Sequence, residues 1–88
     1  MQQERIPPKS WFENKLDYMK KVTKEAKYHP DKHDLKNFVN EEEDFCFYKK
    51  GFEHYRMKTK ALKLRSEMNV VSKRYKSEIK EIKRNKKL

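Results

Sequence analysis

The residues of this chain best suited to chemistry are His29, Pro30 and Asp31, which place an imidazole and a carboxylate on either side of a proline. Proline fixes its own φ, has no N–H and disfavours helical geometry in the preceding residue. We therefore expect a helix to end near His29 and the tripeptide to lie on an exposed turn. Catalysis would also need a nucleophile, an orienting group and a closed pocket, and nothing near the tripeptide suggests them. The sequence predicts a recognition element, and the chain is not expected to be an enzyme.

Metal and disulfide chemistry are not predicted either. His29 and His33 have the i, i+4 spacing of helical ligands, but the proline between them spoils that geometry, and the chain has no paired cysteines. The single cysteine, Cys46, cannot form an internal disulfide, which favours a reducing intracellular compartment such as the cytoplasm, nucleus or mitochondrial matrix. Because Cys46 lies between Phe45 and Phe47 in a helical segment, we expect a buried or partly buried thiol. No cofactor is predicted.

The tripeptide must be positioned by helices, and the first is expected directly before it. Residues 1–9 end in consecutive prolines and a lysine and are predicted to form an irregular leader. Ser10 and Glu13 have the spacing of a capping box, which predicts that the helix begins at Ser10. An apolar stripe at steps of three and four then follows: Phe12, Leu16, Met19, Val22 and Ala26.

The second helix is predicted to begin at Asn40, with Glu43 in the reciprocal capping position and an acidic run at its positive end. Residues 31–39 would then form a loop or one short helical turn. Gly51 costs about 1 kcal/mol relative to alanine inside a helix, and a close approach to the first helix would explain it. The aromatic stripe expected to pack on the first helix is Phe45, Tyr48, Phe52 and Tyr55. The predicted fold is all-α, with an antiparallel hairpin over residues 10–56.

A long basic helix is predicted for the C-terminal extension, residues 57–88, with a kink or break near residues 57–62 as an alternative. Its apolar stripe would be covered by a third helix that folds back or by a partner helix. The stripe is Leu64, Met68, Val71, Tyr75, Ile79 and Ile82. No run of about 20 apolar residues is present, so no membrane span is predicted.

Charge divides the chain into two unlike parts. Residues 1–48 carry nine Lys and Arg against ten Asp and Glu, whereas residues 49–88 carry fifteen against four. A basic block of this kind is typical of proteins that bind phosphate backbones, anionic lipid or an acidic protein face, although a solvated helix explains it equally. No base-reading motif accompanies the charge. The candidate nucleic-acid-binding residues are Lys73, Arg74, Lys76, Lys80, Lys83, Arg84, Lys86 and Lys87.

The segment from Tyr28 to Lys32, Tyr-His-Pro-Asp-Lys, resembles the loop of a J domain, the module with which co-chaperones dock on Hsp70 chaperones. J domains carry a helix after this loop with apolar or small residues at offsets of 3, 6, 7 and 10 from a phenylalanine. The matching residues here are Phe45, Tyr48, Gly51, Phe52 and Tyr55. The resemblance covers roughly residues 15–56.

The resemblance implies docking on an Hsp70-type chaperone without chemistry in this chain. Asp31 would pair with an arginine of the chaperone, and His29 and Pro30 would shape the loop. The basic residues that would contact the chaperone are Lys20, Lys21, Lys24 and Lys27. The short opening helix of the family has no counterpart here, so an assembly or structural subunit of a multi-protein complex that keeps the loop is a variant of this hypothesis. The alternative is a basic helical nucleic-acid binder or ribonucleoprotein subunit that uses the C-terminal half.

Overall fold

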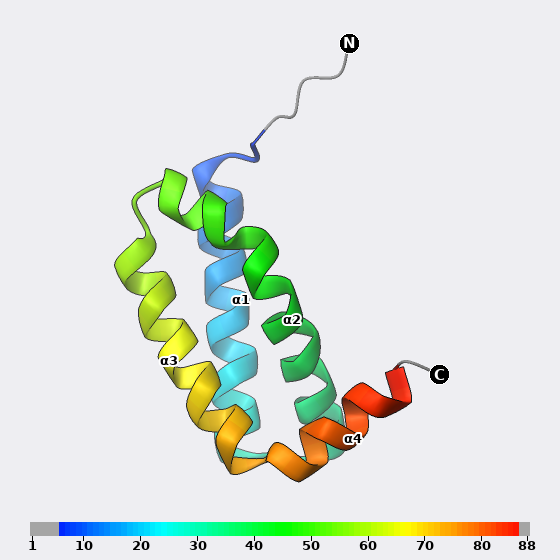
Figure 1. Cartoon of the computed structure of the whole chain (residues 1–88). Coiled ribbons are helices and arrows are strands. Elements are labelled where there is room, and N and C mark those ends of the chain that lie inside the picture. Colours follow the sequence, from blue (N-terminus) through cyan, green and yellow to red (C-terminus); the bar gives the residue numbers. More distant parts are fainter. Residues whose placement is uncertain (1–5, 87–88) are drawn as a thin grey trace.

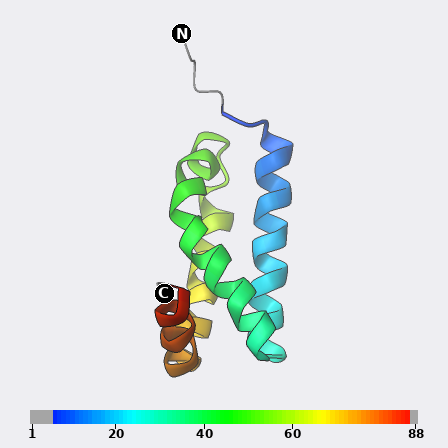
Figure 2. The same ribbon diagram turned by 90° about the vertical axis from the view of Figure 1, so that its right-hand side faces the viewer.

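The computed structural model describes residues 6–86, and all regular structure in this range is helical. The helices are α1 (Lys9–Tyr28), α2 (Lys32–His54), α3 (Lys58–Arg74) and α4 (Lys76–Lys86) (Figure 1). The prediction of an all-α fold is therefore confirmed. α1 and α2 run in opposite directions, α3 returns beside both, and α4 packs on α2 and α3. α2 crosses obliquely between α1 on one side and α4 on the other (Figure 2).

The first helix begins one residue before the predicted capping box. Pro8 is the N-cap, Lys9 is the first helical residue, and no side chain caps this end. The Trp11 N–H donates to the Pro8 carbonyl at 3.0 Å. Proline holds an extended conformation at the cap, so the helix can begin immediately after it. The prediction of a start at Ser10 with Glu13 as its capping partner was therefore wrong.

The second helix begins eight residues before the predicted start at Asn40. Asp31 is its N-cap, and its Oδ1 accepts a hydrogen bond from the Asp34 N–H at 2.8 Å. Aspartate is among the best N-cap residues, and the segment after it continues in helical register with buried Leu35 and Phe38. The predicted loop at residues 31–39 is thus two turns of helix, and Asn40 lies inside α2.

Between α2 and α3 the chain turns through a Schellman motif. The Met57 N–H donates to the Phe52 carbonyl at 2.7 Å and the Arg56 N–H to the Glu53 carbonyl at 3.1 Å. Arg56 has φ 59°, the left-handed conformation that this position requires and that glycine usually supplies. The break therefore falls at residues 55–57. A second break at Tyr75 separates α3 from α4, so the predicted single C-terminal helix is two helices, and α3 folds back on the hairpin.

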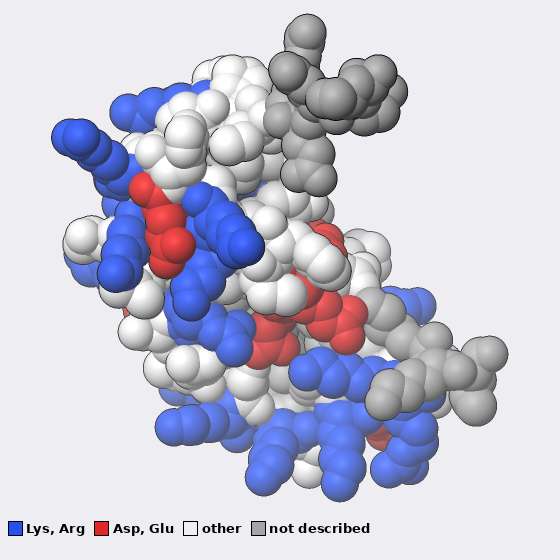
Figure 3. Space-filling view, turned by 45° about the horizontal axis from the view of Figure 1, so that its top comes forward, with Lys and Arg blue, Asp and Glu red and all other residues white. Residues whose placement is uncertain are grey.

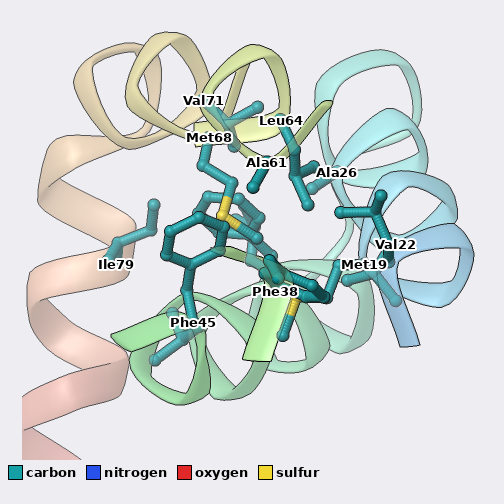
Figure 4. Close-up of a cluster of buried hydrophobic side chains, with 14 of the residues drawn as sticks. Met19, Val22, Ala26, Phe38, Phe45, Ala61, Leu64, Met68, Val71 and Ile79 are labelled. Carbon is teal, nitrogen blue, oxygen red and sulfur yellow. The ribbon is translucent and has the colours of Figure 1, made fainter. Parts of the chain in front are cut away.

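The core lies between α1, α2 and α3 and extends to α4 through Ile79 (Figure 4). All three predicted stripes contribute to it, and Phe38, Phe52, Met19 and Met68 have no exposed surface. Gly51 allows the close approach expected of it, because a Cβ at that position would overlap the ring of Phe12 in α1. The sequence therefore identified the buried faces correctly even where it misplaced the helix ends.

Two tyrosines, each in a connection between helices, form hydrogen bonds to the two ends of α1. The Tyr55 hydroxyl, after α2, donates to the Pro7 carbonyl at 2.6 Å, just before α1 begins. The Tyr75 hydroxyl, between α3 and α4, donates to the Lys27 carbonyl at 3.4 Å, in the last turn of α1. The two ends of α1 thus serve as anchor points for the connections elsewhere in the chain.

Candidate functional site

The His-Pro-Asp tripeptide lies at the turn between α1 and α2. His29 ends α1, with its N–H donated to the Glu25 carbonyl at 2.8 Å, and the Asp31 N–H donates back to the His29 carbonyl at 2.8 Å. All three residues are exposed. The carboxylate of Asp31 caps α2, so this side chain has a structural role as well as an exposed position.

The lysines predicted to form a basic face on α1 lie on two of its sides. Lys20, Lys24 and Lys27 line a groove of about 320 Å³ between α1 and α3, whereas Lys21 is exposed and does not line it. The remaining lining residues are Thr23, Tyr28, Lys63, Leu64 and Glu67. The Lys27 ammonium lies 3.3 Å from a carboxylate oxygen of Glu67. One of the four candidate cations is therefore tied to α3.

A larger basic groove, of about 690 Å³, lies where α4 meets α2 and α3. Its cationic lining residues are Lys73, Lys76, Lys80, Lys83 and Arg84, and the others are Glu42, Ser72 and Ile79. Figure 3 shows Lys and Arg side chains gathered along the lower part of this face, where α4 lies. We call this feature the basic groove. The structure thus brings together five of the eight cations predicted to bind nucleic acid.

The other three predicted cations do not define the groove. Arg74 is exposed at the end of α3 and does not line it. Lys86 ends α4, but its side chain lies outside the described residues, as does Lys87. In the part of the chain that the structure describes, an ion pair is found for Lys83 and none for the other four lining cations.

Glu42 connects three helices at the edge of the basic groove. Its Oε2 accepts a hydrogen bond from the Ser72 hydroxyl of α3 and lies 3.8 Å from an Arg65 guanidinium nitrogen. Its Oε1 lies 3.4 Å from the Lys83 ammonium of α4, and only 11% of the side chain is exposed. A carboxylate with so little access to water requires such partners, because an unpaired buried charge is costly.

Glu41, the neighbour of Glu42, forms the equivalent contact on the α1 side. The Lys15 ammonium lies 3.2 Å from Glu41 Oε1. Burial lowers the pKa of Lys15, but the hydrogen bond to Glu41 and the nearby Glu41, Tyr48 and Asp44 raise it by more, so the pKa of Lys15 lies above its ordinary value. Adjacent acidic residues of α2 therefore join it to helices on opposite sides.

The sequence analysis missed Glu42 and Ser72 and misjudged Cys46. Glu42 was interpreted only as negative charge near the start of a helix, although it stands three residues after Val39 and three before Phe45, in register with the buried stripe. A charged residue in that register is the signal that marks an interhelical ion pair. Cys46 is exposed, so the prediction of a buried or partly buried thiol was wrong. Its position between two aromatic residues was misleading because Phe47 points to solvent.

No family model, curated protein or solved structure matches this chain. Among residues 6–86, no helix has the length and apolar character needed to cross a membrane. Within the same range, His, Cys, Asp and Glu side chains form no cluster that could hold a metal ion.

Proposed function

We propose that this chain binds the phosphate backbone of nucleic acid through the basic groove, without reading base sequence. The observation that supports the proposal is the convergence of five cationic side chains from two helices on one groove, whose described lining residues include a single carboxylate, that of Glu42. A solvated lysine helix would spread its charge around its axis. Here cations from α3 and α4 face the same space.

The spacing of the cations along α4 suits a repeating anion. Lys76, Lys80 and Arg84 stand four residues apart, about 6 Å along the helix axis at 1.5 Å per residue. The flanking Lys73 of α3 adds a cation across the groove. With Lys83 already paired to Glu42, four cations remain to neutralise phosphates. Recognition of base sequence is not part of the proposal. Proteins recognise bases by placing hydrogen-bonding side chains in the major or minor groove of the duplex, whereas contacts with phosphates carry no sequence information.

The test is a salt titration of binding to random-sequence RNA and duplex DNA. Neutralising four phosphates predicts a slope of about −3.6 for log K against log salt on duplex DNA and about −2.8 on single strands. A variant with Lys73, Lys76, Lys80 and Arg84 all replaced by Gln is expected to lose most of the affinity and most of the slope.

A matched control keeps the same net charge change but leaves the groove intact. It replaces four exposed lysines that do not line the groove, Lys49, Lys50, Lys58 and Lys60, by Gln. Equal loss of affinity in both variants would mean that net charge alone drives binding and would contradict the proposal. Binding of the wild type to phosphatidylserine vesicles or a polyglutamate peptide, but not to nucleic acid, would also overturn it.

A second candidate function is docking on an Hsp70-type chaperone, as the J-domain resemblance implies. The observation that favours it is the exposure of His29, Pro30 and Asp31 at the turn between two antiparallel helices. Lys20 and Lys24 would supply the basic contact surface, together with Lys21 on the adjacent side of α1. Two of the candidate residues have other tasks, since Asp31 caps α2 and Lys27 pairs with Glu67, and for this reason we place docking second.

The docking hypothesis has a clean variant in Asp31→Asn. Asparagine caps helices as well as aspartate does, so this change removes the charge that would pair with the chaperone while preserving the start of α2. Docking predicts that the wild type stimulates single-turnover ATP hydrolysis by an Hsp70 and that Asp31→Asn and His29→Gln abolish the stimulation. If the wild type stimulates none of a panel of Hsp70s, the docking hypothesis is wrong, and the role of Asp31 is to cap α2.

A further inference from the structure

We infer that Glu42 is a built-in competitor of the phosphates in the basic groove, which lowers the affinity of the site and holds α4 in place. The inference rests on the proposed function, because it concerns the same groove. It assigns to one residue a property that the charge pattern of the sequence does not reveal. The groove is built with one of its cations already neutralised.

The geometry places Glu42 beside polar or charged side chains of both neighbouring helices. From α3 it faces Arg65 and Ser72, and from α4 it faces Lys83. The other lining groups are the cations Lys73, Lys76, Lys80 and Arg84 and the apolar Ile79. Among the described residues, Glu42 is thus the only carboxylate that lines the groove, and its nearest cation, Lys83, also lines it.

Lys83 is the residue for which the two anions compete. Its side chain is 43% exposed while its ammonium lies 3.4 Å from Glu42 Oε1, so it can reach a phosphate only near a fixed negative charge. A phosphate that pairs with Lys83 must either displace the carboxylate or remain close to it, and like charges at short range repel. Phosphate binding is therefore weaker than it would be in a groove with the same five cations and no carboxylate. The difference corresponds to the contribution of one cation.

The same contact tethers α4 to the bundle. Glu42 is on α2, Lys83 is on α4, and Ser72 is on α3, so one carboxylate joins the three helices that surround the groove. Ligand binding and the Glu42–Lys83 pair are linked reciprocally, because each weakens the other by the same free energy. Nucleic acid bound in the groove is therefore expected to loosen the hold of Glu42 on α4.

The experiment compares the wild type, Glu42→Gln and Glu53→Gln in binding to a single-stranded oligonucleotide and a DNA duplex of random sequence. Gln keeps an oxygen that can accept the Ser72 hydroxyl, and Glu53→Gln is a control with the same charge change at an exposed position of α2. Glu42→Gln is expected to bind more tightly than the control. One more cation available to phosphate should steepen the duplex slope by about 0.9, so the ratio of the two affinities should grow about 3.5-fold between 200 and 50 mM salt.

A second comparison remains informative if Glu42→Gln does not fold. Lys83→Gln removes a cation that Glu42 already neutralises, whereas Lys80→Gln removes one without an ion pair among the described residues. The inference expects a smaller loss of affinity for Lys83→Gln than for Lys80→Gln. Equal losses would overturn it.

The outcomes separate this inference from the proposed function. If the wild type does not bind nucleic acid, the proposed function fails and the inference fails with it. If the wild type binds but Glu42→Gln binds no more tightly than Glu53→Gln, only the inference fails. Weaker binding by Glu42→Gln would mean that the carboxylate positions Lys83 for the ligand instead of competing with it.

Discussion

The α1–α2 hairpin and the α3–α4 pair are held together by different kinds of side chain. Among the described residues, every buried aromatic side chain lies in the hairpin, where it packs with aliphatic residues, and the ring centroid of Phe52 lies 5.7 Å from that of Phe12 and 6.0 Å from that of Phe45. The residues that α3 and α4 bury are aliphatic or sulfur-containing: Ala61, Leu64, Met68, Val71, Ile79 and Ile82. Residues 1–54, which include both helices of the hairpin, carry eleven Lys and Arg against eleven Asp and Glu, whereas residues 55–88 carry thirteen against three. The half that buries the larger side chains is also the half whose charges are balanced.

This difference indicates how a small chain can keep a large excess of positive charge on two helices. Large aromatic side chains bury more apolar area per residue than aliphatic ones, so the hairpin can contribute most of the stability. α3 and α4 then need only a narrow apolar stripe, and their other faces are free to carry cations. Glu41 and Glu42 of α2 lie at the boundary, one joined to α1 and the other to α3 and α4.

The largest effect is expected from breaking the hairpin core. Phe52→Ala removes a fully buried ring and should cost about 3–5 kcal/mol, a large fraction of the total stability of a small domain, which is about 5–15 kcal/mol. Ile82→Ala, near the end of α4, should cost about 2 kcal/mol. The measurement is urea unfolding followed by circular dichroism. A loss at Ile82 as large as that at Phe52 would contradict the unequal roles of the two halves.

A smaller effect is expected for Gly51→Ala, and its sign is opposite to that usual for Gly→Ala inside a helix. Gly→Ala at an open helix position stabilises by about 1 kcal/mol, but here the new methyl group would overlap the ring of Phe12, and such overpacking costs about 1–3 kcal/mol. Gly51→Ala should therefore lower the free energy of unfolding or leave it unchanged. In a Phe12→Leu background the same change should be less harmful. Additive effects of the two substitutions would rule out the proposed contact.

The same residues show what the sequence could and could not predict. The period of the apolar residues identified the buried faces of α1, α3 and α4 and that of α2 from Phe45 onward, because burial of a stripe is a local property of a helix. Helix ends were predicted less well, since Asp31 was assigned to a recognition loop and its capacity to cap α2 was overlooked. The cations of the basic groove were among the predicted nucleic-acid-binding residues, but the groove that they line was not predicted. Its formation depends on the break at Tyr75 that turns α4 away from α3, and no proline or glycine marks that break.

A stabilising effect is expected at Arg56, which connects the two halves. Its φ of 59° is strained for a residue with a side chain by about 1–2 kcal/mol, and glycine removes that strain. Glycine also gains more freedom in the unfolded chain, which offsets part of the benefit. Arg56→Gly should therefore raise the free energy of unfolding by up to about 1 kcal/mol, measured by urea unfolding. Arg56→Val, a β-branched residue at the same φ, is the comparison and should destabilise.

The smallest effect concerns the Lys15–Glu41 pair, which joins the two helices of the balanced half. Because the folded state raises the pKa of Lys15, the pair contributes fully below the unfolded pKa, about 10.4, and the contribution is lost as pH rises through the folded pKa. The free energy of unfolding of the wild type minus that of Lys15→Met should therefore be constant from pH 7 to 9.5 and fall above pH 10.5. The total change should not exceed about 1 kcal/mol, because the Lys15 ammonium retains access to water through the 21% of its side chain that is exposed, and water screens the pair. A difference that stays constant to pH 12 would mean that Lys15 contributes through the packing of its aliphatic chain against Tyr48, whose ring centroid lies 5.1 Å from the ammonium, and not through its charge.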